Sequence, residues 1–191
     1  MKKIIIIFFF LTKFAYAETK IIKIASVNET LITNIDLQNE IIVNKLLFGE
    51  NLKNIEEFSL NNLIDQAIKQ SEIKKNNIKV NINLIENEYK KITNSYKLSE
   101  KITSKIKDKI FEKIKIEAEW NTLISQIYGW KTNINLSEIN EIILNKNNKN
   151  SGDVSISEKE KLIELEKNKK FKVYSTNHLD EKKKIALIKL Y

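Results

Sequence analysis

The chain has 191 residues, a formal net charge of +8 and no cysteine or proline. This length can bury one hydrophobic core, while the lack of cysteine excludes a disulfide framework, thiol catalysis and zinc sites built on cysteine. All basic residues are lysine, and they are spread along almost every polar face without interleaved aromatics. The positive charge therefore does not indicate a nucleic-acid partner.

The first 17 residues have the three parts of a secretory signal peptide. Lys2 and Lys3 give a positive start, residues 4–11 are apolar, and residues 15–17 have the small-x-small pattern of a cleavage site. The apolar run is far shorter than the roughly 20 residues that a membrane-spanning helix needs. We therefore expect cleavage after residue 17, a periplasmic location and no stable membrane insertion afterwards.

Residues 23–33 predict a β-hairpin that leads directly into a helix. Apolar residues stand on both sides of Asn28 and Glu29, which are typical of a tight turn between two strands. Either Thr33 or Asn34 can accept hydrogen bonds from the first free backbone N–H groups of the helix that follows.

Apolar residues at spacings of three and four predict a series of helices after the hairpin. In chain order these are 34–48, ended by Gly49; 59 to about 75, capped by Ser59; 83–96, with a capping box from Asn83 and Glu86; 99–128, ended by Gly129; and 135–144.

The polar stretch at 145–152 has no apolar residue to bury and is the clearest boundary in the chain. Beyond it we expect a helix from Ser157 to about Lys170, a second helical stretch over 171–184 and a strand over 185–190. Because a two-stranded hairpin is marginal alone, the last strand should pair with the N-terminal hairpin. The alternative is a frayed apolar tail.

Several short segments of this chain carry a family resemblance. The segments are Val27-Asn28-Glu29 with Ile32-Thr33 and Asp36-Leu37; Asn77-Ile78-Lys79-Val80; Trp120 with Leu123-Ile124; Asn133 to Glu138; Asn177-His178-Leu179; and Ala186-Leu187-Ile188. They resemble the corresponding segments of SurA-type periplasmic chaperones, and the likeness covers most of the chain after residue 17.

The resemblance implies a mainly α fold, in which a multi-helix chaperone core carries a small N-terminal β-hairpin joined by a C-terminal strand. It divides the chain into a helical domain over 18–144, a linker over 145–152 and a C-terminal helix and strand over 153–191 that pack back on the first domain. In the family, parvulin-type prolyl isomerase domains stand at the position of the linker. Too few residues remain here for such a domain.

The function implied is that of an ATP-independent holdase without cofactor or metal. Its partners would be unfolded outer-membrane β-barrel proteins or extended peptides. A dedicated envelope assembly factor with a single protein partner remains an alternative, and a homodimer is compatible with the sequence.

Aromatic side chains are the candidates for client contact, because they bury much area at low entropy cost. The candidate peptide-binding residues are Phe48, Phe58, Tyr96, Tyr128 and Trp130. Phe48, Phe58 and Trp130 are the better candidates, since they fall at predicted helix ends or loops. Three other aromatics lie on helical apolar stripes and are expected in the core: Tyr89, Phe111 and Trp120.

No catalytic site is expected in this sequence. His178 is the only histidine and is expected to be structural or solvated. The carboxylates alternate with lysines as on a solvated helix face, and the three glycines are scattered, so no phosphate-binding loop is present. We therefore predict a binding protein without prolyl isomerase activity.

Overall fold

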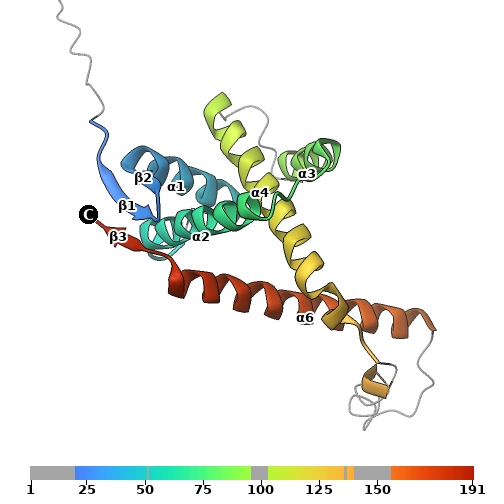
Figure 1. Cartoon of the computed structure of the whole chain (residues 1–191). Helices are drawn as coiled ribbons and strands as arrows, with labels where there is room; N and C mark the ends of the chain where they lie inside the picture. Colours follow the sequence, from blue (N-terminus) through green and yellow to red (C-terminus); the bar gives the residue numbers. More distant parts are fainter. Residues whose placement is uncertain (1–19, 51, 96–102, 136, 140–155) are drawn as a thin grey trace, which may run out of the picture.

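The computed structural model describes residues 20–50, 52–95, 103–135, 137–139 and 156–191, which form a mainly helical fold with one small sheet (Figure 1). The elements are β1 (Lys23–Val27), β2 (Thr30–Thr33), α1 (Asn34–Phe48), α2 (Ile55–Lys75), α3 (Ile82–Ser95), α4 (Ser104–Tyr128), the 3₁₀ turn η1 (Gly129–Thr132), α6 (Ile156–Ile185) and β3 (Ile188–Leu190). Residues 137–139 are also helical. The predicted signal peptide over 1–17, the linker over 145–152 and Tyr96 lie outside the described residues.

The sheet has the strand order β2-β1-β3, with both pairs antiparallel. Val27 is opposite Thr30 across the predicted two-residue turn, where Asn28 adopts a left-handed backbone with a φ of 52°. On its other edge Val27 is opposite Ile188 of β3. The predicted pairing of the last strand with the N-terminal hairpin is thus confirmed, and with it the mainly α fold class.

Asn28 also ties the hairpin to the segment that leads into β3. Its backbone N–H donates to the Leu187 carbonyl at 2.9 Å, and its side-chain Oδ1 accepts from the Leu187 N–H at 2.9 Å. One asparagine therefore supplies both the left-handed turn and the first contacts of the closing strand.

Helix α1 has the predicted bounds, and its ends show why. Thr33 is the N-cap, since its Oγ1 accepts from the Asp36 N–H at 3.2 Å and its own N–H donates to Asp36 Oδ2 at 3.1 Å. This reciprocal pair is a capping box. Gly49 ends the helix with a φ of 92°, a conformation that costs glycine little.

Two predicted caps are wrong. Helix α2 begins at Ile55 after a left-handed Asn54, and the proposed cap Ser59 is buried inside the helix, where it accepts a hydrogen bond from Asn44 Nδ2 at 2.9 Å. Helix α3 begins at Ile82, so Asn83 lies within it. Its backbone N–H donates at 2.9 Å to Asn81 Oδ1, which takes the capping role.

The C-terminal helix also differs from the prediction. Residues 156–185 form one helix of 30 residues without a break near Lys170. No glycine or proline stands in this range, so nothing in the backbone stops the helix. Gly129 does follow α4 as predicted, but its φ of −53° carries the chain into the 3₁₀ turn η1 instead of a left-handed cap.

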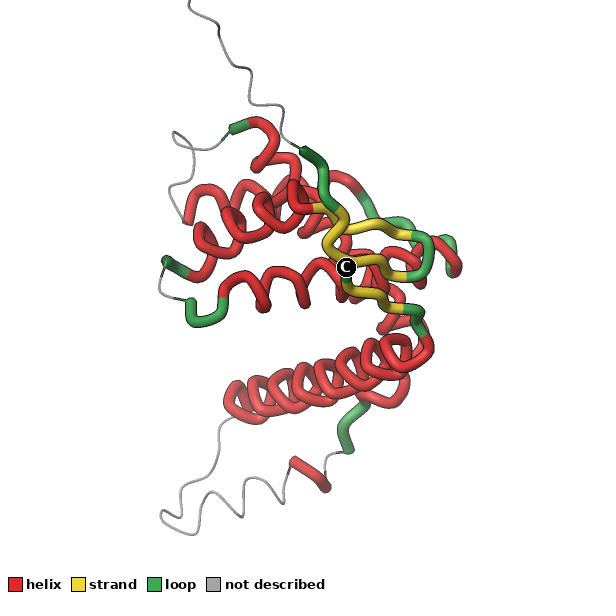
Figure 2. The backbone as a smooth tube through the Cα atoms, turned by 90° about the vertical axis from the view of Figure 1, so that its left-hand side faces the viewer, coloured by secondary structure: helices red, strands yellow, loops and turns green. Residues whose placement is uncertain are grey.

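Among the described residues, the core has three clusters of buried side chains. The first joins β1 and β2 to α2, the second joins the end of α2 to the second half of α4, and the third joins α1 to the first half of α4. Leu179 of α6 packs against both the first and second clusters. Helix α6 therefore connects the sheet to α4. Figure 2 shows it below the larger group of helices, with one end next to the sheet.

No helix in the described part of the chain combines the length and the apolar character that crossing a membrane would need.

Candidate functional site

An open apolar groove of about 440 Å³ runs between α3 and α4, with one residue from the end of α1. Its aliphatic lining consists of Leu47, Leu84, Ile85, Ile92, Ile110, Ile114 and Ala118, and its polar lining of Glu88, Lys113, Glu117 and Asn121. Leu84 is 66% exposed, so the apolar lining of the groove is open to solvent. The groove is therefore the candidate binding site.

Helix α3 forms one wall of the groove because only one side of it packs against α4. Among the described elements, α4 is the one against which α3 packs extensively. Ile85 is buried in this contact, and the rings of Tyr89 and Phe111 meet edge to face with centroids 5.8 Å apart. Of the other apolar residues of α3, Ile82 and Leu84 are exposed and Ile92 is half-buried.

A buried polar network fixes the helices beneath the groove. Lys113 of α4 forms an ion pair with Glu40 of α1, and its Nζ also donates to Asn44 Oδ1 at 3.1 Å. Gln66 of α2 donates to Glu40 Oε1 at 3.3 Å. Glu40 is only 5% exposed, and its carboxylate balances the charge of Lys113 on the buried side of the groove. The groove therefore favours apolar ligands.

Phe48 and Phe58, two of the predicted site residues, come together. Their rings pack edge to face with centroids 5.9 Å apart, and both side chains remain partly open to solvent, at 59% and 37%. Phe48 follows Leu47, which lines the groove. The aromatic pair therefore joins the end of α1, where Leu47 lines the groove, to the first turn of α2.

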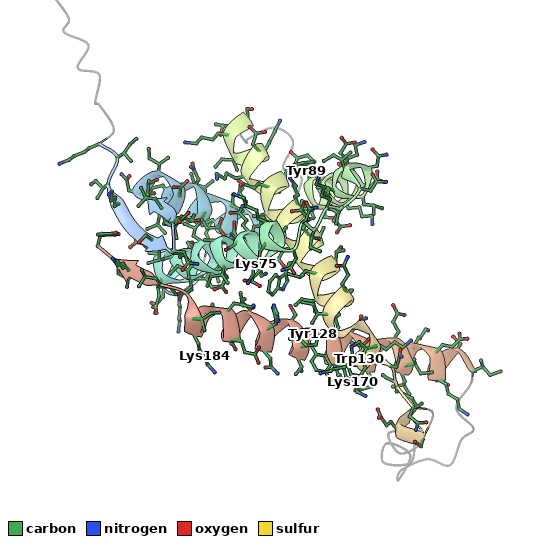
Figure 3. The ribbon with its side chains drawn as sticks, in the orientation of Figure 1. Lys75, Tyr89, Tyr128, Trp130, Lys170 and Lys184 are labelled. Atoms are coloured by element: carbon green, nitrogen blue, oxygen red, sulfur yellow. The ribbon has the colours of Figure 1, made fainter. Side chains whose placement is uncertain are left out.

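Trp130 lies elsewhere in the molecule. It is 70% exposed on η1, with Lys131 Nζ 5.1 Å from the ring centroid. Figure 3 shows Trp130 beside α6, well away from Tyr89 and the groove wall. The structure therefore does not gather the predicted aromatics into one site.

Tyr128 serves to attach α6 to α4. Its ring stacks on Tyr174 with centroids 5.2 Å apart, and its hydroxyl is 2.9 Å from His178 Nδ1. Of the three predicted core aromatics, Trp120 is buried as expected, whereas Tyr89 and Phe111 are only half-buried. Trp120 Nε1 donates to Ser175 Oγ of α6 at 2.9 Å.

The aliphatic groove residues were not among the predicted site residues, all of which are aromatic. A signal was present in the sequence. Ile82 and Leu84 lie beside the stripe of Ile85, Tyr89 and Ile92, so the apolar face of α3 is wider than one packing contact requires.

His178 is buried between α6, α4 and α2. Burial lowers the pKa of its imidazole, and the nearby charge of Lys182 lowers it further, while Glu72 and Glu181 act in the opposite direction. The Tyr128 hydroxyl is hydrogen-bonded to His178 Nδ1, whereas His178 Nε2 is buried without a hydrogen-bond partner among the described residues. The neutral imidazole is thus the form that suits the fold.

The stability of the protein is expected to decrease as the pH falls through the ordinary histidine pKa of about 6.5. Below that value the unfolded chain binds a proton at His178 before the folded chain does, because the folded pKa is lowered. Urea unfolding at pH 7.5 and pH 5.5 measures this loss. The variant His178→Phe has no imidazole to titrate, so its free energy of unfolding should fall less between these two pH values. Equal falls in the variant and the unsubstituted protein would contradict the prediction.

Among the described residues, no cluster of three or more histidine, aspartate or glutamate side chains is arranged to hold a metal ion. Neither a scan against protein-family models nor a search of the curated proteins finds a match for this chain.

Proposed function

We propose that this protein is an ATP-independent periplasmic chaperone that holds unfolded outer-membrane β-barrel proteins, with the α3–α4 groove as part of its client-binding surface. The observation that carries the proposal is an open groove lined mainly by aliphatic side chains, including the exposed Leu84. The signal-like residues 1–17 and the resemblance to SurA-type chaperones support the location and the client class.

The chemistry of the groove suits clients of this kind. Strands of outer-membrane barrels alternate apolar and polar residues, and their apolar side chains stay exposed until the barrel is inserted. An aliphatic groove binds such side chains without requiring a particular sequence. Binding to the unfolded form competes with aggregation by mass action, so no nucleotide is needed.

The pair of Phe48 and Phe58 extends this surface. Both rings are partly exposed. Phe48 ends α1 and follows the groove residue Leu47, and Phe58 lies in the first turn of α2. A client segment that also covered these two rings would gain affinity, because aromatic rings bury area with little loss of side-chain entropy.

The variant Leu84→Lys is expected to weaken client holding. Leu84 is exposed in the free protein, so the substitution should leave the fold intact while removing about 1–2 kcal/mol of apolar contact, or about five- to thirtyfold in affinity. The measurement is the chaperone concentration that halves the light scattering of a barrel protein diluted from urea. Leu165→Lys, at a half-exposed leucine of α6, is the matched control.

Equal behaviour of the two variants would contradict the role of the groove. The assay should be run on several unrelated barrel proteins. Suppression of all of them supports a general holdase, whereas suppression of one alone indicates the dedicated assembly factor. A prolyl isomerisation assay on the same preparation is expected to show no rate above background.

A further inference from the structure

The free edge of β3 is a second exposed feature, separate from the groove. In the part of the chain that the structure describes, β3 packs against β1 and has no extensive contact with any other element. Figures 1 and 2 both place it at the outside of the sheet. Unpaired strand edges can template another strand, but a three-residue edge with a central lysine resists unselective pairing.

The hydrogen-bond pattern shows which groups this edge offers. Tyr191 donates to the Ile24 carbonyl at 3.0 Å, and the Leu187 carbonyl accepts from Asn28 at 2.9 Å. In an antiparallel ladder alternate residues point to opposite sides. The N–H and C=O groups of Ile188 and Leu190 therefore point away from β1, toward an additional strand.

The side chains of these two residues are also uncovered. The register places Ile188 opposite Val27 and Leu190 opposite Ala25, so all four share the inner face of the sheet. Val27 and Ala25 are buried against α2, but Ile188 is 37% exposed and Leu190 is 68% exposed. A further strand with apolar residues on that face would continue the apolar layer and cover both side chains.

Lys189 determines which strand fits. It lies opposite Ser26 on the outer face and forms no ion pair within the described residues. A second copy that paired with both Ile188 and Leu190 about a two-fold axis would place Lys189 directly opposite its own copy. Like charges at that position destabilise a pair, whereas opposite charges stabilise it. The edge therefore disfavours self-pairing and favours an acidic residue.

We propose that the free edge of β3 binds one extended segment of another polypeptide by strand addition. The segment carries apolar residues opposite Ile188 and Leu190 and an acidic residue opposite Lys189. Backbone hydrogen bonds supply the affinity, and the apolar–acidic–apolar pattern supplies the selectivity. This site does not depend on the groove, and it holds whether or not the groove binds clients.

The test uses capped nine-residue peptides of alternating valine and threonine, with a central glutamate between two valines. Binding is measured by fluorescence anisotropy of labelled peptide, on the full protein and on its Leu84→Lys variant, in which binding to the groove is weakened. A peptide with central lysine should bind about fivefold more weakly, which corresponds to the upper range of a cross-strand charge pair. A peptide with proline for one flanking valine should bind about tenfold more weakly, because an N–H group is lost and the strand is broken.

The variant Lys189→Glu should reverse the preference between the glutamate and lysine peptides, and Leu84→Lys should leave it unchanged. Because the second variant alters the groove alone, failure of this inference and failure of the proposed chaperone function are distinguishable. Binding that is insensitive to proline and to Lys189→Glu would overturn the proposal. So would self-association in sedimentation velocity that Leu190→Pro abolishes, since a second copy would then occupy the edge.

Discussion

Replacing Trp120 with alanine is expected to destabilise the protein by about 3–5 kcal/mol, the range for truncating a large buried aromatic. Trp120 is 1% exposed in the cluster that joins α2 and α4. Its ring centroid is 5.5 Å from that of His178, and its Nε1 donates to Ser175. The substitution would thus open a cavity and also remove a hydrogen bond that attaches α6.

Urea unfolding followed by far-ultraviolet circular dichroism measures this loss. Trp130→Ala is the matched control, because it removes the same side chain from an exposed position on η1 and should change the stability by less than about 0.5 kcal/mol. Trp120→Phe should fall between the two, since it keeps most of the volume and loses the donor. A loss below about 1 kcal/mol in Trp120→Ala would show that the cluster does not hold the fold.

Replacing Glu40 with methionine is expected to destabilise the protein by about 3 kcal/mol, the lower end of the range for a broken buried ion pair. The carboxylate of Glu40 faces Lys113 and Gln66 at the interface of α1, α2 and α4. Without it, Lys113 keeps an uncompensated charge. The loss stays at the lower end because Lys113 also lines the open groove and can turn toward water.

The reverse substitution, Lys113→Met, should be worse, because Glu40 is only 5% exposed and its carboxylate has no comparable route to solvent. The double variant Glu40→Met/Lys113→Met should recover most of the loss, since neither charge is then left unpaired. Chemical denaturation of the four proteins gives the coupling energy. Strictly additive losses would show that the two side chains act independently.

The sequence predicts the ends of the fold better than its middle. The hairpin, the bounds of α1 and the pairing of the last strand follow from local chemistry at a few positions, such as Thr33, Asn28 and Gly49. Ser59 shows where this reasoning fails. A serine before an apolar run is typical of a cap, but here the hydroxyl is used inside the core by Asn44. A partner fifteen residues away leaves no trace in the local pattern.

The same limit applies to the candidate site. Local position correctly indicated that Phe48 and Trp130 would be exposed. It could not show that Phe48 pairs with Phe58 while Trp130 lies apart, because that depends on how α1, α2 and α4 cross. The groove is likewise a property of two helices together, since Leu84 and Ile114 become neighbours only once α3 has packed on α4.

The contact between Asn28 and Leu187 has a consequence for how the protein folds. These residues are separated by 159 positions, so the sheet is completed by one of the most distant pairings in the chain. Contacts of such high sequence separation close slowly, because a long loop must be ordered first. The helices are expected to assemble early, with strand closure as the last step. The sheet therefore stays open until α6 and β3 are in place, which makes the Asn28–Leu187 contact a marker of the fully assembled fold.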